Sequence, residues 1–212
     1  MIRKLKSGEY RLYSRKKDPR TGRRRNLRLQ ILAICVGWLA GVMTAAQGPA
    51  PIGTTGAAAP ASATANLIDA QGRNIGEARL QQTPHGVLLK LDLRSAPPGI
   101  HGMHIHDVGT CAAPSFESAG GHFNPSGHQH GFLNPRGPHT GDLPNIEVPP
   151  TTNLSMEYMV ADVTLEPGSL SLLDANGSAI VIHAGKDDHA SDPAGASGNR
   201  LACGGIVRSD TR

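Results

Sequence analysis

The stretch Gly99-Ile-His-Gly-Met-His-Ile-His-Asp-Val-Gly-Thr-Cys111 carries three histidines within six residues. His104 and His106 are separated by a single residue, so in an extended strand both imidazoles project from the same face. Two neighbouring imidazoles of this kind can bind copper or zinc, and the pair alone does not choose between the two metals. The stretch therefore predicts a β-strand that carries part of a metal site and runs out into a loop.

The segments around this stretch have the alternation of half-buried strands. Leu89, Leu91 and Leu93 alternate with charged residues, and short apolar runs separated by turn residues recur further along the chain. Gly 26 and Pro 16 with 3% aromatic residues favour short strands over a helical bundle. We expect an all-β domain, a Greek-key sandwich or flattened barrel of about eight antiparallel strands. The other expected strands are 67–68, 75–82, 87–95, 154–165 with a bulge near Ala161, 201–207, and a closing hairpin of 170–173 with 179–183.

Two long segments without periodicity, 112–150 and 184–199, separate the later strands. They are rich in Gly, Pro, Asn and His rather than in apolar residues. Structureless segments of this length inside a compact domain are usually functional. We therefore expect two long functional loops next to the metal site.

Charge is distributed unevenly along the chain. The overall net charge is +4, yet residues 1–46 carry a net +10 and the remaining residues a net −6. The basic character belongs to a short N-terminal segment, so it gives no reason to expect a nucleic-acid partner.

The N-terminal part divides into three segments ahead of the folded domain. Residues 1–28 are basic and form either a small hairpin or, as we favour, a solvated segment, because so short a hairpin is rarely stable alone. Residues 29–46 are mainly apolar and form a signal peptide or a membrane anchor, with small residues near Ala46 that favour cleavage. Residues 47–65 form an Ala/Pro-rich linker, and 66–212 the domain. Since positive residues stay in the cytoplasm, we expect the domain to be periplasmic or otherwise extracytoplasmic.

Further histidines and one arginine complete a pattern that extends over the whole domain. The motifs are Gly121-His-Phe-Asn-Pro125, His130-Gly131, His139-Thr-Gly-Asp142, His183 at the end of an apolar run, and Arg200-Leu-Ala-Cys-Gly204. With them the sequence resembles the copper/zinc superoxide dismutase family over roughly residues 63–208. The short loop between His183 and Arg200 is closest to the bacterial exported type.

The resemblance implies one copper ion and one zinc ion per chain, with a histidine shared between them. The donor chemistry agrees, because three imidazoles and a carboxylate suit a closed zinc site, while imidazoles with an open position suit copper. The implied copper ligands are His104, His106, His122 and His183, and the implied zinc ligands are His122, His130, His139 and Asp142.

The implied reaction is dismutation of superoxide to oxygen and hydrogen peroxide. In the family, the shared imidazole, here His122, leaves copper and takes a proton when copper is reduced. Arg200 matches an arginine that attracts the anion at the copper site, and Lys186 would add a smaller share of this attraction. Asp187 matches an aspartate that hydrogen-bonds one ligand of each metal, and His101 a histidine that braces the barrel.

The resemblance also pairs Cys111 with Cys203 in a disulfide, which is consistent with an exported domain. The remaining histidines have plainer interpretations: His85 and His189 as surface residues, and His128 as an exposed loop residue close enough to His130 to compete for zinc.

Two other classes of protein fit parts of this pattern. A non-catalytic domain of the same fold could store or deliver copper, but such a relative would be expected to lack a copper ligand or the arginine. An adhesion sandwich with histidines that bind only zinc would hold one metal per chain. A homodimer is compatible with the sequence, which does not decide the oligomeric state.

Overall fold

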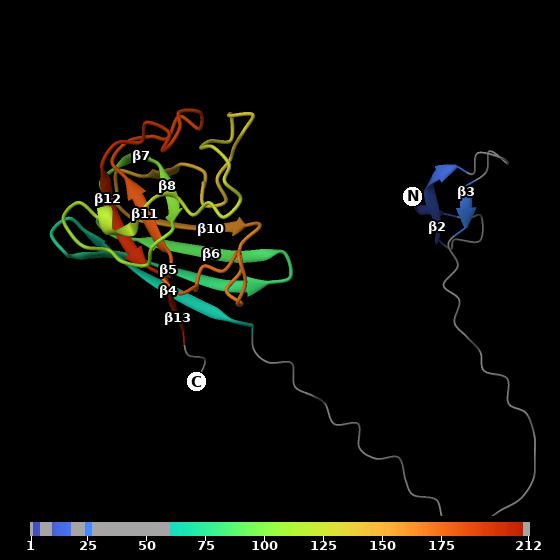
Figure 1. Cartoon of the computed structure of the whole chain (residues 1–212), viewed down its shortest axis with the longest axis horizontal. Helices are drawn as coiled ribbons and strands as arrows, with labels where there is room; N and C mark the ends of the chain where they lie inside the picture. Colours follow the sequence, from blue (N-terminus) through green and yellow to red (C-terminus); the bar gives the residue numbers. More distant parts are fainter. Residues whose placement is uncertain (1, 5–9, 18–23, 27–59, 210–212) are drawn as a thin grey trace, which may run out of the picture. The chain divides into compact units, whose positions relative to one another are not determined.

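The computed structural model describes residues 2–4, 10–17, 24–26 and 60–209, which belong to two compact units, Met1–Thr54 and Thr55–Arg212 (Figure 1). Each unit is described by itself. The expected signal peptide or anchor at 29–46 and most of the expected linker lie outside the described residues. Among the residues that are described, no helix has the length and apolar character needed to cross a membrane.

The first unit contains a three-stranded antiparallel sheet. Its strands are β1 (Ile2–Lys4), β2 (Tyr10–Lys17) and β3 (Arg24–Asn26), with β2 in the middle. Within the described residues, the basic segment therefore contains the hairpin that was the alternative expectation. A lone short hairpin was expected to be unstable, but here a third strand, β1, also pairs with β2.

The second unit is all-β, as predicted. One antiparallel sheet has the order β10-β6-β5-β4-β12-β11-β8, with β13 also paired to β4, while β7 and β9 form a separate pair. The late strand β12 returns to lie beside β4, next to the antiparallel run β4-β5-β6. The elements are β4 (Ser62–Asp69), β5 (Asn74–Thr83), β6 (Gly86–Leu93), β7 (Gly99–His101), β8 (Met103–His106), a 3₁₀ turn η1 (Glu117–Ala119), β9 (Ile146–Val148), β10 (Leu154–Val160), β11 (Ala179–His183), β12 (Arg200–Gly205) and β13 (Val207–Arg208).

The core is aliphatic and lies against one face of the sheet. Alternate residues of β4 and β6 are buried, which gives both strands the same burial pattern and confirms their period of two. Strand β8 is buried on both faces. Met103 and Ile105 belong to the hydrophobic core, so His104 and His106 project together from the opposite face.

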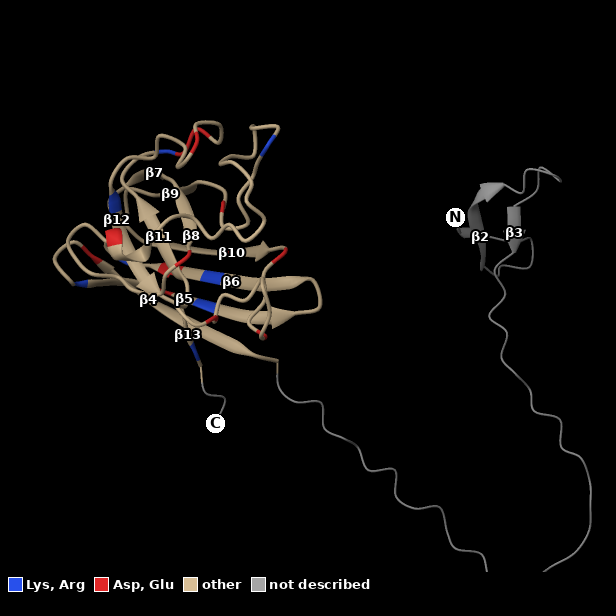
Figure 2. Cartoon of the chain, in the orientation of Figure 1, with Lys and Arg blue, Asp and Glu red and all other residues tan. Residues whose placement is uncertain are grey.

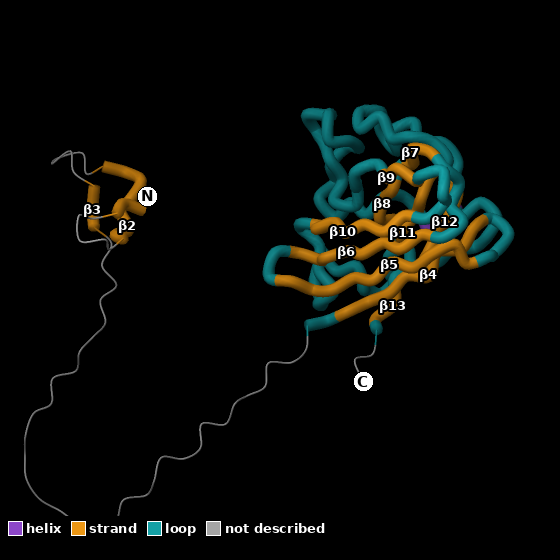
Figure 3. The backbone as a smooth tube through the Cα atoms, turned by 180° about the vertical axis from the view of Figure 1, so that it is seen from behind, coloured by secondary structure: helices purple, strands orange, loops and turns teal. Residues whose placement is uncertain are grey.

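Long loops connect β8 to β9 and β11 to β12. The second matches the loop expected at 184–199, whereas β9 lies inside the segment 112–150 that was expected to be a loop throughout. In Figure 3, loop segments gather at the end of the unit beside β7 and β9. The antiparallel pairing of β11 with β8 sets Val181 opposite His104 and Ala179 opposite His106. This pairing brings the ends of both long loops to the strand that carries the two histidines.

Several details of the expected strands differ from the structure. The stretch expected as one strand is divided at Gly102 into β7, which pairs with β9, and β8, which pairs with β11. Strand β4 begins at Ser62, four residues before the expected boundary at 66, because Ala63 and Ala65 pack into the core. The strand expected at 154–165 ends at Val160, and a turn with Asp162 at φ 57° takes the place of the bulge. The prediction of a closing hairpin between 170–173 and 179–183 is wrong. Residues 170–173 lie in a loop that buries Leu172, and β11 pairs with β8 and β12 instead. A short apolar run does not by itself distinguish a strand from such a loop.

Candidate metal centre

Four histidines from three parts of the fold converge beside β8. His104 and His106 come from β8, His183 from the end of β11, and His122 from the first long loop. One ring nitrogen from each lies within 4.8 Å of the corresponding nitrogens of the other three. The His104 and His122 rings are closest, with centroids 4.0 Å apart.

The local backbone explains how His183 and His122 reach this place. The register of β11 with β12 shifts between Ile182 and His183, and the His183 N–H donates to the Gly102 carbonyl at 2.8 Å. His122 forms an isolated antiparallel bridge with His106. Backbone pairing with the edge of β8 therefore fixes the first long loop at His122.

In each of the four rings, one nitrogen is hydrogen-bonded to another group of the protein and the other nitrogen has no such partner. The bonded nitrogens are His104 Nε2 to Asp187 Oδ2 at 2.7 Å, His106 Nδ1 to Gly120 O at 3.0 Å, His122 Nδ1 to Asp142 Oδ1 at 2.8 Å, and His183 Nδ1 to Gly198 O at 3.1 Å. The other nitrogens, His104 Nδ1 and Nε2 of His106, His122 and His183, are buried without a hydrogen-bond partner. Because buried polar atoms are normally paired, four unpaired nitrogens that face one another fit a metal ion.

Burial keeps the rings of three of these histidines neutral. Desolvation lowers the pKa of His104 to about 4 and that of His183 to about 4, against the favourable hydrogen bonds that each ring makes. Desolvation also lowers the pKa of His106 to about 2, and the nearby His122 adds to the effect. At neutral pH these imidazoles therefore have free lone pairs, which is the state that binds metal.

A second group of ligand atoms surrounds Asp142 Oδ1. This oxygen lies 2.8 Å from His122 Nδ1, 3.0 Å from His130 Nδ1 and 3.3 Å from His139 Nδ1. Tetrahedral zinc with bonds of about 2.0 to 2.1 Å separates its ligand atoms by about 3.3 Å. Three imidazoles and one buried carboxylate at these separations fit zinc.

One ligand atom from each of His104, His122, His130 and Asp142 also lies within 4.8 Å of the others, which makes His104 an alternative to His139 in the second group. The free nitrogen of His104 belongs to the four-histidine group, whereas His139 Nδ1 lies 3.3 Å from both His122 Nδ1 and Asp142 Oδ1. The pairwise distances therefore favour His139 as the fourth member of the second group. His122 is common to both groups.

Hydrogen bonds within the second group shift the pKa values of His130 and Asp142. Burial alone would lower the pKa of His130, but hydrogen bonds to Asp142 and Asp187 outweigh it and raise the pKa to about 9. Burial alone would raise the pKa of Asp142, but His122 and His130 hold it well below its usual range. Two carboxylates on one imidazole provide strong negative potential at the place where a cation would bind.

Asp187 connects the two groups from the second long loop. Its Oδ2 lies 2.7 Å from His104 Nε2, its Oδ1 lies 3.0 Å from His130 Nε2, and its side chain is 0% exposed. Burial alone would raise the pKa of Asp187, but the hydrogen bonds from His104 and His130 lower it below its usual range. The carboxylate thus directs one nitrogen of each ring and leaves the other nitrogen for a metal.

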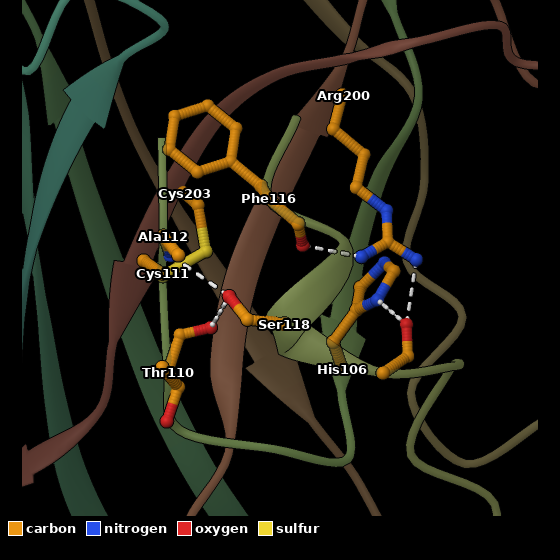
Figure 4. Close-up of a disulfide and its surroundings, with 9 residues drawn as sticks. His106, Thr110, Cys111, Ala112, Phe116, Ser118, Arg200 and Cys203 are labelled. Atoms are coloured by element: carbon orange, nitrogen blue, oxygen red, sulfur yellow. Dashed lines mark hydrogen bonds between the residues drawn. A yellow bond between two sulfur atoms is a disulfide. The ribbon is translucent and has the colours of Figure 1, made fainter. Parts of the chain in front are cut away.

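Arg200 lies beside the four-histidine group at the start of β12. Its Nη1 donates to Phe116 O at 2.5 Å and its Nη2 to Gly120 O at 2.6 Å (Figure 4). It borders a hollow of about 830 Å³ that His106, His122 and His183 also line. Lys186 is exposed and does not line this hollow.

Cys111 and Cys203 form a disulfide, as predicted, with Cα atoms 5.6 Å apart. The bond ties the beginning of the first long loop to β12, the strand that also carries Arg200. Ser118 reinforces this loop, since its Oγ donates to Thr110 O and accepts from the Ala112 N–H (Figure 4). The loop that supplies both acceptors of Arg200 is therefore anchored covalently.

The other histidines lie outside both ligand groups. His101 is buried, with Nδ1 2.8 Å from His183 O and Nε2 3.0 Å from Pro97 O, so it braces the backbone of a ligand. His128 is exposed and contacts Pro138 O. His189, expected at the surface, is mostly covered, with a side chain 22% exposed against Phe132. Its partner Asn145 was not singled out from the sequence, where only its place shortly after Asp142 could have drawn attention.

Comparison with known proteins agrees with this geometry. The family model described as copper/zinc superoxide dismutase matches residues 74–206. A superoxide dismutase [Cu-Zn] of Aquifex aeolicus is 49% identical over 146 residues, covering 68% of this chain and 85% of the relative. One from Caulobacter vibrioides is 43% identical over 148 residues, with coverage of 68% and 85%. The crystal structure of a SOD-like protein from Bacillus subtilis superposes with a TM-score of 0.66 at 37% identity, covering 68% of this chain and 97% of that one.

Proposed function

The chain belongs to the copper/zinc superoxide dismutase family, and from that membership we propose how its own residues serve the dismutation of superoxide. One observation carries the proposal. Four buried and unpaired imidazole nitrogens face one another beside a hollow that Arg200 also lines. This arrangement combines a metal-binding pocket with a route by which a small anion can reach it.

The proposed ligands follow from the two groups. His104, His106, His122 and His183 would hold copper, and His122, His130, His139 and Asp142 would hold zinc, with His122 common to both. The separations around Asp142 Oδ1 support the zinc set, and the free nitrogens support the copper set. When bound, copper supplies the one-electron redox chemistry of the reaction, and zinc supplies a fixed charge that holds ligands in place.

The reaction consumes two superoxide ions and two protons for each oxygen and hydrogen peroxide. His122 Nε2 is the candidate atom to hold one of these protons, because it is unpaired and its ring lines the hollow. Its Nδ1 belongs to the proposed zinc ligand set, 2.8 Å from Asp142 Oδ1, so the ring would keep its orientation whether or not Nε2 carries a proton. This division of roles between the two nitrogens supports His122 as a proton carrier.

Arg200 would attract and orient the anion. The chain after residue 46 has a net charge of −6, and Figure 2 shows acidic residues on several loops of the second unit. An approaching anion therefore meets an unfavourable average potential, and a fixed positive charge in the hollow provides a local focus. Burial lowers the pKa of Arg200 from its ordinary value, but a guanidinium still stays charged at neutral pH.

We propose an extracytoplasmic location for the second unit. The Cys111–Cys203 disulfide suggests an oxidising compartment. Residues 29–46 would direct export as a cleaved signal peptide or a retained anchor, preceded by the basic segment 1–28 and followed by the linker. Assembly as a homodimer stays a prediction.

The test is an assay of the exported protein, expressed from the full chain and loaded with both metals. We expect superoxide loss well above the spontaneous rate, with one hydrogen peroxide formed for every two superoxide ions. A fully metallated protein that does not accelerate this loss would contradict the proposal and favour the copper-carrier alternative.

A further inference from the structure

The two long loops are joined next to the candidate zinc ligands. The Leu133 N–H donates to His189 O at 2.8 Å, and the rings of Phe132 and His189 lie 5.2 Å apart. Gly131 has φ +104°, and a Cβ at this position would overlap the His189 carbonyl oxygen. His189, from the second loop, is therefore packed directly against the residues that follow His130 in the first.

Asn145 holds both backbone groups of Asp187 through one amide. Its Oδ1 accepts the Asp187 N–H at 2.8 Å, and its Nδ2 donates to Asp187 O at 2.9 Å. The same Nδ2 lies 2.9 Å from His189 Nε2. A single side chain from the first loop thus fixes the backbone of the aspartate that contacts both metal-ligand groups.

These hydrogen bonds determine which nitrogen of the neutral His189 ring carries the proton. Because the Asp187 N–H can only donate, the atom of Asn145 that it meets is the oxygen, and the other atom is the NH₂ group. That group donates to His189 Nε2, so the ring proton lies on Nδ1. His189 Nδ1 is buried without a hydrogen-bond partner, 3.6 Å from Asp187 Oδ2. The His189 N–H also donates to Asp187 Oδ1 at 2.6 Å.

We propose that Asn145 and His189 are positioning residues that hold the Asp187 carboxylate between His104 and His130. With the carboxylate in this place, His130 presents Nδ1 to Asp142 and His104 presents Nδ1 to the four-histidine group. Without the contacts of Asn145 and His189, the Asp187 carboxylate can turn away. The His104 and His130 rings then lose the partner that orients them. The inference rests on the proposed function, because it takes the zinc site as its readout.

The test measures zinc release from the zinc-loaded full-chain protein to a chromogenic chelator at neutral pH. Asn145→Ala removes all three hydrogen bonds of the Asn145 side-chain amide. His189→Leu removes the Nε2 acceptor but keeps an apolar group packed against Phe132. Asp187 is the outer partner of His104 and His130, and loss of such a partner commonly costs about 10- to 100-fold in metal affinity, so displacing Asp187 should reach the lower end of that range. We expect both variants to release zinc about 10-fold faster than the wild type.

Three further variants separate positioning from general stability. His189→Gln restores an acceptor for Asn145 and should release zinc at close to the wild-type rate. Val163→Ala weakens the core at a residue 4% exposed, and His85→Leu makes the same substitution in the exposed β5–β6 turn. Both should lack the fast release, even where Val163→Ala lowers the melting temperature as much as His189→Leu.

The inference is overturned if zinc-loaded Asn145→Ala and His189→Leu release zinc at the wild-type rate. It is equally overturned if His189→Gln is as fast as His189→Leu, or if Val163→Ala at matched stability is as fast as both. A wild-type protein that binds no zinc would instead overturn the proposed function.

Discussion

His106 and Arg200 are joined through one shared acceptor. His106 Nδ1 lies 3.0 Å from the Gly120 carbonyl oxygen, and Arg200 Nη2 donates to the same oxygen at 2.6 Å (Figure 4). Because His106 bonds this oxygen through Nδ1, its Nε2 stays unpaired in the four-histidine group. The second bond to the same oxygen fixes the Arg200 guanidinium beside that ring. The positive charge that would attract superoxide is therefore held at a set position relative to a proposed copper ligand.

The first prediction concerns this charge. Arg200→Glu should keep both metals, because Arg200 belongs to neither ligand group, yet lower the superoxide-dependent rate by at least about 10-fold, since electrostatic focusing changes association rates by about 10- to 1000-fold. Arg200→Ala should also flatten the dependence of the rate on ionic strength, because salt screens only charges that are present. Pulse radiolysis at several salt concentrations measures both effects.

Arg94→Glu is the matched control for Arg200→Glu. Arg94 is exposed and does not line the hollow, so the same change of charge there should alter the rate much less. Full metal content with an undiminished rate in Arg200→Glu would show that the arginine has no role in the reaction.

The second prediction concerns the disulfide between Cys111 and Cys203. The bond closes a sequence separation of 92, and a loop of this length is worth about 4 to 5 kcal/mol in the chain-entropy model. Cys111→Ser with Cys203→Ser should lower the free energy of unfolding by up to that amount. It should also lower activity, since the loop that follows Cys111 carries both acceptors of Arg200.

Denaturant unfolding of the oxidised protein and the double variant checks the change in stability. Mass spectrometry of the exported, non-reduced protein should find both thiols blocked. Two free thiols at these positions would be incompatible with the prediction.

The third prediction concerns the pH dependence of the metal-free protein. The folded pKa values of His104 and His183 are about 4, below the unfolded value of about 6.5, so between these pH values the unfolded chain binds more protons and stability rises with pH. The folded pKa of His130 is about 9, so the stability it contributes is lost as pH rises from about 6.5 through 9. Stability should therefore be greatest at about pH 6.5.

Thermal unfolding of the metal-free protein between pH 4 and 9 checks this dependence. Zinc should reduce the loss of stability on the alkaline side, because it takes the place of the proton on His130. A melting temperature that rises steadily across the whole range would contradict the assignment of His130.

The sequence predicted those parts of the molecule that depend on local periodicity. The two-residue spacing of His104 and His106 gives both their common face and their strand, because a strand has a side-chain period of two. The disulfide and the convergence of His122 and His183 on β8 were predicted only through the family resemblance. Spacing along the chain does not show which distant residues meet.

Other features depend on backbone atoms or on weak local signals. The carbonyls of Phe116 and Gly120 hold Arg200, and any residue type provides a carbonyl, so the sequence does not mark them. Leu172 is buried from a loop, which apolar periodicity mistook for a strand. Asn145 and His189 gain their roles only from the contact between two loops that lie far apart in sequence.

The central claim is that His122 belongs to both metal sites, and the metal content of His122→Ala tests it most directly. Elemental analysis of the wild type should give one copper and one zinc per chain, and His128→Ala, which changes an exposed histidine of the same loop, should keep both. In His122→Ala, copper and zinc content should both fall. Loss of one metal with full retention of the other would contradict the shared ligand.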